Sequence, residues 1–170
     1  MTPGAHRPES DIRLLVLDVD GVLTDGRLHF GPRGEVVKLF HVRDGLGIKQ
    51  LGAAGITVAV ISGRRSGMVT ARCRELGLQH VLQGVKDKVA AFDELCSRLN
   101  IAALACACVG DDVPDVPLMR KVALAFAVAD AHPEARRAAH VVTALPGGAG
   151  AVREVCDYLL SGQPAAVEPR

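Results

Sequence analysis

The 170-residue sequence has no tryptophan, one tyrosine and four phenylalanines, so it offers almost no aromatic surface on which nucleic-acid bases could stack. One sign of charge does not dominate either, because 20 Lys and Arg residues face 19 Asp and Glu residues, which leaves no broad positive field for a polyanion. No apolar run approaches the roughly 18 residues of a membrane span. We therefore expect no nucleic-acid partner and no membrane.

Cysteines are few, and their spacing fits neither a disulfide framework nor a zinc site. Five are present, an odd number in a chain long enough to need no disulfide. Cys106 and Cys108 lie in an apolar run, and there is no second Cys or His pair at zinc-ligand spacing. Residues 1–11 are polar and lack the apolar core of a signal peptide. These features predict reduced, buried thiols and a cytoplasmic location.

Apolar segments of strand length alternate with segments of helical period. The expected strands are residues 12–17, 57–61, 80–82, 106–109, 123–128 and 141–142, and the expected helices are residues 45–54, 66–76, 86–99, 113–120 and 150–160. Strands that are apolar on both faces and alternate with helices are typical of a parallel sheet covered on both sides. We expect one doubly wound, Rossmann-like α/β domain over residues 1–170.

One segment departs from this alternation. Two short strand-like stretches flank the turn sequence Gly31-Pro32-Arg33-Gly34, which predicts a β-hairpin flap over residues 26–40. A lone hairpin is marginal in water, so its apolar side chains favour packing against another copy of the chain over folding back on their own domain. These side chains are Leu28, Phe30, Val36, Val37 and Leu39. Residues 161–170, with two Pro, are expected to form a mobile tail.

Carboxylates follow the expected strands at the edge where ligands bind in open α/β sheets. Asp18 and Asp20 follow the first strand, Ser62 and Gly63 follow the second, and a Gly-Asp-Asp-Val-Pro-Asp segment begins at residue 110. Any one of these carboxylates could simply cap the following helix. Carboxylates gathered at one edge repel one another unless a cation neutralises them, and an oxygen-only ligand set points to Mg²⁺. With a Lys and a Ser hydroxyl nearby, such a site suits phosphoryl groups.

At these residues the sequence resembles the haloacid dehalogenase superfamily of phosphotransferases. The matching motifs are DVDGVLTDG at 18–26, SGR at 62–64, Lys88 and GDDVPD at 110–115, in the order in which the superfamily carries them. The resemblance implies an aspartyl-phosphate mechanism with Asp18 as nucleophile and Asp20 as general acid and base. Ser62 would hydrogen-bond the phosphoryl group and Lys88 would neutralise it, with Lys86 as the competing lysine.

The resemblance also implies a metal site and its surroundings. Mg²⁺ would be bound by Asp18, Asp111 and the carbonyl of Asp20, while Asp112 and Asp115 would act from outside the ligand set or through water. The spacing between motifs leaves no room for the cap domain that most superfamily members carry. An uncapped site either admits a macromolecular phosphoester or is walled off by a neighbouring subunit.

Over almost its whole length the chain resembles one capless branch, the phosphatases of 3-deoxy-D-manno-octulosonate 8-phosphate and of related nine-carbon sugar acid phosphates. The longest matching stretches are residues 26–48, 62–88 and 147–160. The branch implies a homotetramer whose hairpins partly cover neighbouring sites, and an enzyme that releases the sugar acid for lipopolysaccharide precursor synthesis. The anionic sugar phosphate calls for further cations, and the candidate contacts are Arg64, Gly63, Lys38 and Arg43.

Other functions stay open on the sequence alone. A nine-carbon acid would keep the chemistry and change only the sugar. A phosphatase of phosphoproteins or nucleic acids would suit an open, monomeric site. A non-enzymatic receiver module also gathers carboxylates around Mg²⁺, but there the acidic pair is contiguous, whereas here Asp18 and Asp20 are separated by Val19.

Overall fold

A six-stranded sheet forms the centre of the computed structural model, which describes residues 12–161. All neighbouring strands of this sheet pair in parallel, in the order β5-β4-β1-β6-β7-β8. The strands are β1 (Leu14–Leu17), β4 (Thr57–Ser62), β5 (His80–Gln83), β6 (Cys106–Gly110), β7 (Leu124–Ala127) and β8 (Val141–Val142). Strands β1, β6 and β7 are buried along their whole length, which is why they are apolar on both faces.

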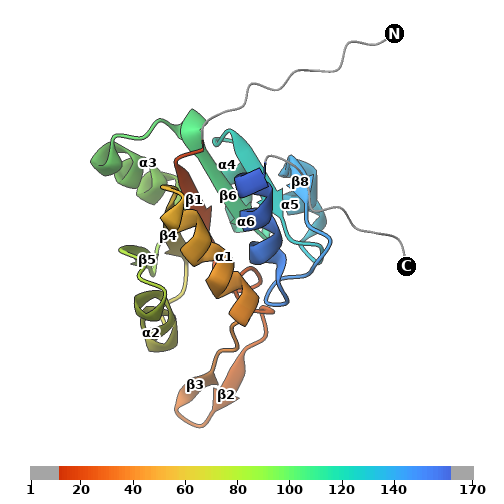
Figure 1. Cartoon of the computed structure of the whole chain (residues 1–170). Coiled ribbons are helices and arrows are strands. Elements are labelled where there is room, and N and C mark those ends of the chain that lie inside the picture. Colours follow the sequence, from red (N-terminus) through yellow and green to blue (C-terminus); the bar gives the residue numbers. More distant parts are fainter. Residues whose placement is uncertain (1–11, 162–170) are drawn as a thin grey trace.

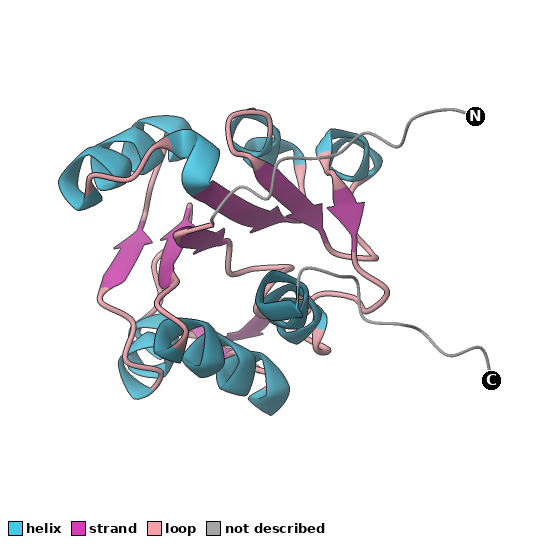
Figure 2. Cartoon of the chain, turned by 45° about the horizontal axis from the view of Figure 1, so that its top comes forward, coloured by secondary structure: helices cyan, strands magenta, loops and turns pink. Residues whose placement is uncertain are grey.

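Helices cover both faces of the sheet (Figures 1 and 2). Helices α1, α2 and α6 lie on one face, and α3, α4 and α5 lie on the other. Their bounds are α1 (Val42–Ala53), α2 (Gly67–Glu75), α3 (Lys88–Leu99), α4 (Val116–Met119), α5 (Pro133–Ala138) and α6 (Ala151–Ser161), with short 3-10 turns at Ala103–Ala105 and Val113–Asp115. The buried apolar side chains of both layers form one core. The expected doubly wound α/β fold is confirmed.

Local capping explains where the helices differ from expectation. Helix α1 begins earlier than expected, because the side chain of His41 accepts a hydrogen bond from the backbone N–H of Arg43. Helix α3 begins at Lys88 because Asp87 is its N-cap and accepts from the N–H groups of Val89 and Ala90. Helix α5 was not expected from the sequence, since it is only six residues long and starts at a Pro.

The hairpin consists of β2 (His29–Gly31) and β3 (Gly34–Val37), an antiparallel pair outside the main sheet. Figure 1 shows it projecting from the body of the domain beyond the start of α1. Phe30 and Leu39 are 65% and 60% exposed in the single chain. No further domain interrupts the described residues, in agreement with the expected absence of a cap.

The cysteines have the state expected from the sequence, because all five are buried and free. Among residues 12–161 no helix is long and apolar enough to cross a membrane. The expected mobile tail, apart from Ser161, and the polar N-terminal segment lie outside the described residues.

Candidate active site

The candidate site lies where the sheet order reverses. Strand β1 pairs with β4 on one side and with β6 on the other, and Leu17 is in register with both Val60 and Val109. Asp18 therefore leaves β1 beside the end of β6, from which Asp111 follows. This crevice at the carboxyl ends of adjacent strands is the usual ligand position of such sheets.

Lys88 joins two of the carboxylates. Its Nζ lies 3.0 Å from Oδ1 of Asp18 and 2.6 Å from Oδ1 of Asp115. All three side chains are at least 88% buried, because their exposed fractions are 10%, 12% and 6%. Lys86, the competing lysine, is exposed. The start of α3 thus brings Lys88, and not Lys86, to the first strand.

Asp115 shapes the loop after β6. Its Oδ2 accepts hydrogen bonds from the backbone N–H groups of Asp111, at 3.0 Å, and of Asp112, at 3.3 Å. Asp112 caps the 3-10 turn by accepting from the N–H of Val113 at 2.7 Å. Asp115 consequently fixes both the backbone that carries Asp111 and the ammonium that contacts Asp18.

The carboxylate of Asp111 lies directly against the backbone after Asp20. A Cβ atom on Gly21 would stand 2.0 Å from Oδ2 of Asp111, and Gly21 has φ +91°. Both the close approach and the left-handed backbone require glycine at this position. The glycine of the first motif therefore allows Asp111 to reach the Asp18–Asp20 segment.

The charges at this edge are not balanced by the protein. Burial raises the pKa of Asp18 from 3.8 to about 6, although Lys88 opposes the shift. Burial together with the negative charges of Asp18, Asp115 and Asp112 raises the pKa of Asp111 from 3.8 to about 8. Burial works against the charged form of Lys88, but Asp18 and Asp115 outweigh it and raise its pKa.

A divalent cation fits this arrangement. One oxygen each from Asp18, Asp111 and Asp115 can be chosen so that all lie within 4.8 Å of one another. Within the described part of the chain, the Asp111 side chain has no hydrogen-bond or ion-pair partner, whereas Asp115 is engaged by Lys88 and two amides. Hard oxygen ligands carrying surplus negative charge suit Mg²⁺. Asp18 and Asp111 are thus the side chains available to it.

A second charged cluster surrounds Asp20. Lys38, at the end of the hairpin, forms a short ion pair with Oδ1 of Asp20 and lies 2.8 Å from Oε1 of Glu35. The Nε of Arg64 lies 3.6 Å from Oδ2 of Asp20. The hydrogen bond from Lys38 lowers the pKa of Glu35. The sequence pointed to Asp20, Lys38 and Arg64 but missed Glu35, whose only signal is its spacing three residues before Lys38.

The Ser62 loop is held by the loop after β5. Ser62 is 3% exposed, and its carbonyl accepts from the N–H of Val85 at 3.1 Å. The carbonyl of Arg64 accepts from the N–H of Gly84, also at 3.1 Å. Gly63 lies between them and is exposed. These bonds fix the loop at the end of β4, next to β1.

Arg43 is not brought into either cluster. It is exposed in the first turn of α1 and forms none of the ion pairs among residues 12–161.

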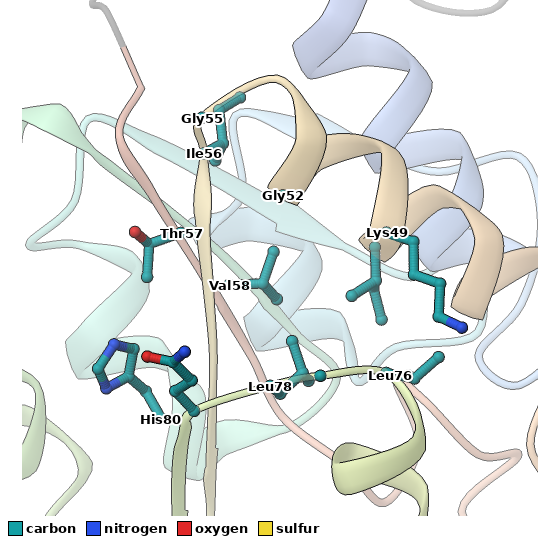
Figure 3. A pocket seen from close by; sticks show the side chains of 12 residues that line it. Lys49, Gly52, Gly55, Ile56, Thr57, Val58, Leu76, Leu78 and His80 are labelled. Carbon is teal, nitrogen blue, oxygen red and sulfur yellow. The ribbon is translucent and has the colours of Figure 1, made fainter.

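A hollow of about 370 Å³ lies at the other end of the sheet, where β4 and β5 begin (Figure 3). Thr57, Leu78 and His80 are among the residues that line it. It is therefore separate from the carboxylates.

Known proteins are similar to this chain in sequence and in fold. Residues 80–153 match the family model of haloacid dehalogenase-like hydrolases. The chain is 49% identical over 163 residues to the 3-deoxy-D-manno-octulosonate 8-phosphate phosphatase of Salmonella typhimurium, covering 96% of this chain and 87% of that protein. It is 52% identical over 153 residues to the phosphatase of the same name from Escherichia coli K12, covering 90% and 81%.

A solved structure agrees with these relatives. The Moraxella catarrhalis 3-deoxy-D-manno-octulosonate 8-phosphate phosphatase, in complex with magnesium ion, phosphate ion and KDO, has a TM-score of 0.87 to this chain. The sequence identity is 40%, and the match covers 91% of this chain and 88% of that one.

Proposed function

The chain belongs to the haloacid dehalogenase-like hydrolases, in the branch of the 3-deoxy-D-manno-octulosonate 8-phosphate phosphatases, and from this membership we propose its reaction in residue detail. It is a phosphatase that hydrolyses 3-deoxy-D-manno-octulosonate 8-phosphate to the sugar acid and phosphate. The observation that carries the residue assignment is the contact of Lys88 with Asp18 at 3.0 Å, beside Asp111.

Mg²⁺ is the cofactor of this reaction. Asp18, Asp111 and the carbonyl of Asp20 would hold the ion, and Asp115 supports Asp111 through the backbone bonds described above. When bound, the ion supplies positive charge that neutralises the phosphoryl oxygens and the surplus charge of the carboxylates.

Asp18 is the nucleophile. One of its carboxylate oxygens attacks phosphorus, the bond from phosphorus to the sugar oxygen breaks, and an aspartyl-phosphate forms. Lys88 orients Asp18 and balances its charge, which opposes the effect of burial on its pKa. Ser62, at the end of the neighbouring strand, hydrogen-bonds a phosphoryl oxygen.

Asp20 moves the protons. It donates a proton to the sugar oxygen as that oxygen leaves, and then accepts one from the water that attacks the aspartyl-phosphate. The second step breaks the bond between phosphorus and the Asp18 oxygen, which releases inorganic phosphate, returns Asp18 to a carboxylate and leaves Asp20 protonated as at the start. Asp18 directly follows β1, and Asp20 lies two residues further on, in the turn after the strand.

Cations beside Asp20 suit an acidic sugar. Arg64 is 43% exposed while its guanidinium faces Asp20, so it can hydrogen-bond a carboxylate or hydroxyl of the substrate. Lys38 and the backbone of Gly63 complete this side of the site. Arg43 is exposed on α1, outside both clusters, and stays a candidate contact to substrate.

A homotetramer completes the site in this proposal. The single chain exposes Phe30, Val36 and Leu39 on or next to the hairpin, at 65%, 60% and 60%. Burying such side chains contributes about 1.5 to 3 kcal/mol each, enough in repeated copies to hold subunits together. The hairpin would then wall off a neighbouring site. The enzyme would work in the cytoplasm, in lipopolysaccharide precursor synthesis.

The test is phosphate release from a panel of purified sugar phosphates, with Mg²⁺ present and after chelation. We expect a preference for 3-deoxy-D-manno-octulosonate 8-phosphate, loss of activity with the chelator, and recovery with Mg²⁺ rather than Zn²⁺. A preference for a nine-carbon acid phosphate would overturn the substrate, and a chelator-resistant enzyme would overturn the metal site.

A further inference from the structure

The geometry points to Glu35 as a positioning residue of the phosphatase reaction, one that fixes Lys38 and Arg64 around Asp20. The inference rests on the proposed function, because it needs Asp20 to act on the leaving group. It adds a hairpin carboxylate to the machinery, where the motifs place none.

Glu35 contacts both cations. Its Oε1 lies 2.8 Å from Nζ of Lys38, and its Oε2 lies 3.4 Å from a guanidinium nitrogen of Arg64. The side chain is only 9% exposed, although it comes from a hairpin whose apolar side chains face solvent in the single chain. The carboxylate of Glu35 therefore points inward, toward the site, from an element that otherwise projects away.

Lys38 depends on this second carboxylate. Its side chain is 1% exposed, so the ammonium has lost nearly all contact with water. A buried cation is stable only when neighbouring groups satisfy its charge and its hydrogen bonds. Asp20 supplies one partner and Glu35 the other, and together they hold the ammonium at one oxygen of Asp20.

Arg64 depends on Glu35 differently. Because its side chain is 43% exposed, it would be free to swing into solvent. Contact with Glu35 and Asp20 directs the guanidinium over the same carboxylate that must meet the leaving oxygen. Two cations, Lys38 and Arg64, and two acidic side chains, Glu35 and Asp20, form one cluster, which links the hairpin to Asp20. Glu35 thus positions the groups that protonate the leaving oxygen and bind the sugar. It does not position the groups that attack or bind the phosphoryl group.

The experiment compares the unmodified protein with Glu35→Gln, which keeps the shape and removes the charge. Two substrates are used: the sugar phosphate that the unmodified protein hydrolyses fastest, and p-nitrophenyl phosphate, whose leaving group departs without a proton. We expect kcat/KM on the sugar phosphate to fall roughly 10- to 100-fold, the size of a misplaced catalytic geometry. On p-nitrophenyl phosphate it should fall less than about threefold.

Glu75→Gln is the matched control. Glu75 is 65% exposed and pairs with Arg72 on α2, so the same change there removes one ion pair whose carboxylate is exposed and contacts neither Asp20 nor Lys38. Unfolding midpoints and molecular mass are measured for each variant. Equal losses on both substrates, or no loss on either, would overturn the inference and assign Glu35 a structural role or none.

A double-mutant cycle shows whether Glu35 acts through Lys38. We expect Glu35→Gln combined with Lys38→Met to lose less than the product of the two single losses, because both changes disturb one contact. If the loss of the double variant equals the product of the two single losses within about twofold, the inference is overturned. Failure of the proposed function would be seen in a different measurement: the unmodified protein would show no preference for the expected sugar acid phosphate.

Discussion

Gly147 packs directly against Gly21, since a Cβ atom on Gly147 would stand 1.8 Å from the carbonyl oxygen of Gly21. The N–H of Gly147 donates to Oδ1 of Asp130 at 3.0 Å, and the N–H of Gly148 donates to the carbonyl of Val22 at 3.0 Å. The loop before α6 thus presses on the turn that follows Asp20. The C-terminal part of the domain thereby helps to place the first motif.

The first prediction follows from this contact. Gly147→Ala should destabilise the protein by about 1 to 3 kcal/mol, as overpacking does, and should lower kcat because the turn after Asp20 must move. The control is Gly52→Ala on α1, where a Cβ would meet nothing within 4 Å. Denaturant unfolding and kcat measure both effects, and a Gly147 variant as stable as the control would contradict the packing argument.

Asp18→Asn should abolish turnover while the fold survives. Loss of the attacking oxygen is expected to lower kcat by about 10⁴ or more. Asp93→Asn serves as control, because Asp93 pairs with Lys121 at the surface. Phosphate release and circular dichroism are the measurements. Turnover near that of the unmodified protein would exclude Asp18 as the nucleophile.

Asp20→Asn should discriminate between leaving groups. Turnover of a sugar phosphate needs the proton from Asp20, whereas an activated ester does not, so only the first should fall by roughly 10² or more. The ratio of kcat values on the two esters is the measurement. Equal losses would leave Asp20 with a structural role only.

The metal-free protein should lose stability as pH rises. The pKa of Asp111 is about 8 in the folded chain against 3.8 ordinarily, so the folded state binds the extra proton. Its contribution to stability is full below about pH 4 and declines as pH rises toward about 8. Urea midpoints of metal-free protein across this range should fall, and Asp111→Asn should flatten the decline.

Added Mg²⁺ supplies the control for this prediction. The cation would favour the ionised carboxylates, so stability in its presence should no longer fall with pH in the same window. Identical pH slopes for the unmodified protein and the Asp111 variant, both free of metal, would contradict the assignment of the shift to Asp111.

Charged substitutions on the hairpin should break the assembly. Phe30→Asp and Leu39→Asp would place carboxylates where apolar side chains meet in the proposed tetramer, which light scattering detects as a smaller mass. Leu104→Asp is the control, since Leu104 is 73% exposed away from the hairpin. An unmodified protein that is already monomeric would refute the assembly.

The dissociated variant also tests the shared wall. It should keep activity on a generic phosphoester, because Asp18, Lys88 and Asp111 come from one chain, yet lose kcat/KM on the sugar acid disproportionately. An undiminished preference for the sugar acid phosphate would leave the hairpin with no role at the neighbouring site.

The sequence alone predicted the alternation of strands and helices and the edge of the sheet at which the site lies. Both follow from local properties, because a strand that is apolar on both faces must be buried and a carboxylate after it must emerge at its carboxyl end. Asp18, Asp20 and Asp111 were identifiable for the same reason, whereas Lys88 was singled out by the resemblance to the superfamily, with Lys86 as its competitor. Short, weakly periodic elements such as α5 were not.

Which of these residues come into contact depends on how the strands and helices pack in three dimensions. The neighbouring positions of β1 and β6 bring Asp18 beside Asp111, and the N-cap at Asp87 sets Lys88, rather than Lys86, against Asp18. The contacts of Glu35 and Gly147 could not be predicted from neighbouring residues, since an acidic residue in a hairpin and a glycine in a loop are ordinary. Their importance arises from groups distant in the sequence, Arg64 and Gly21, and contacts of that kind exist only once the chain has folded.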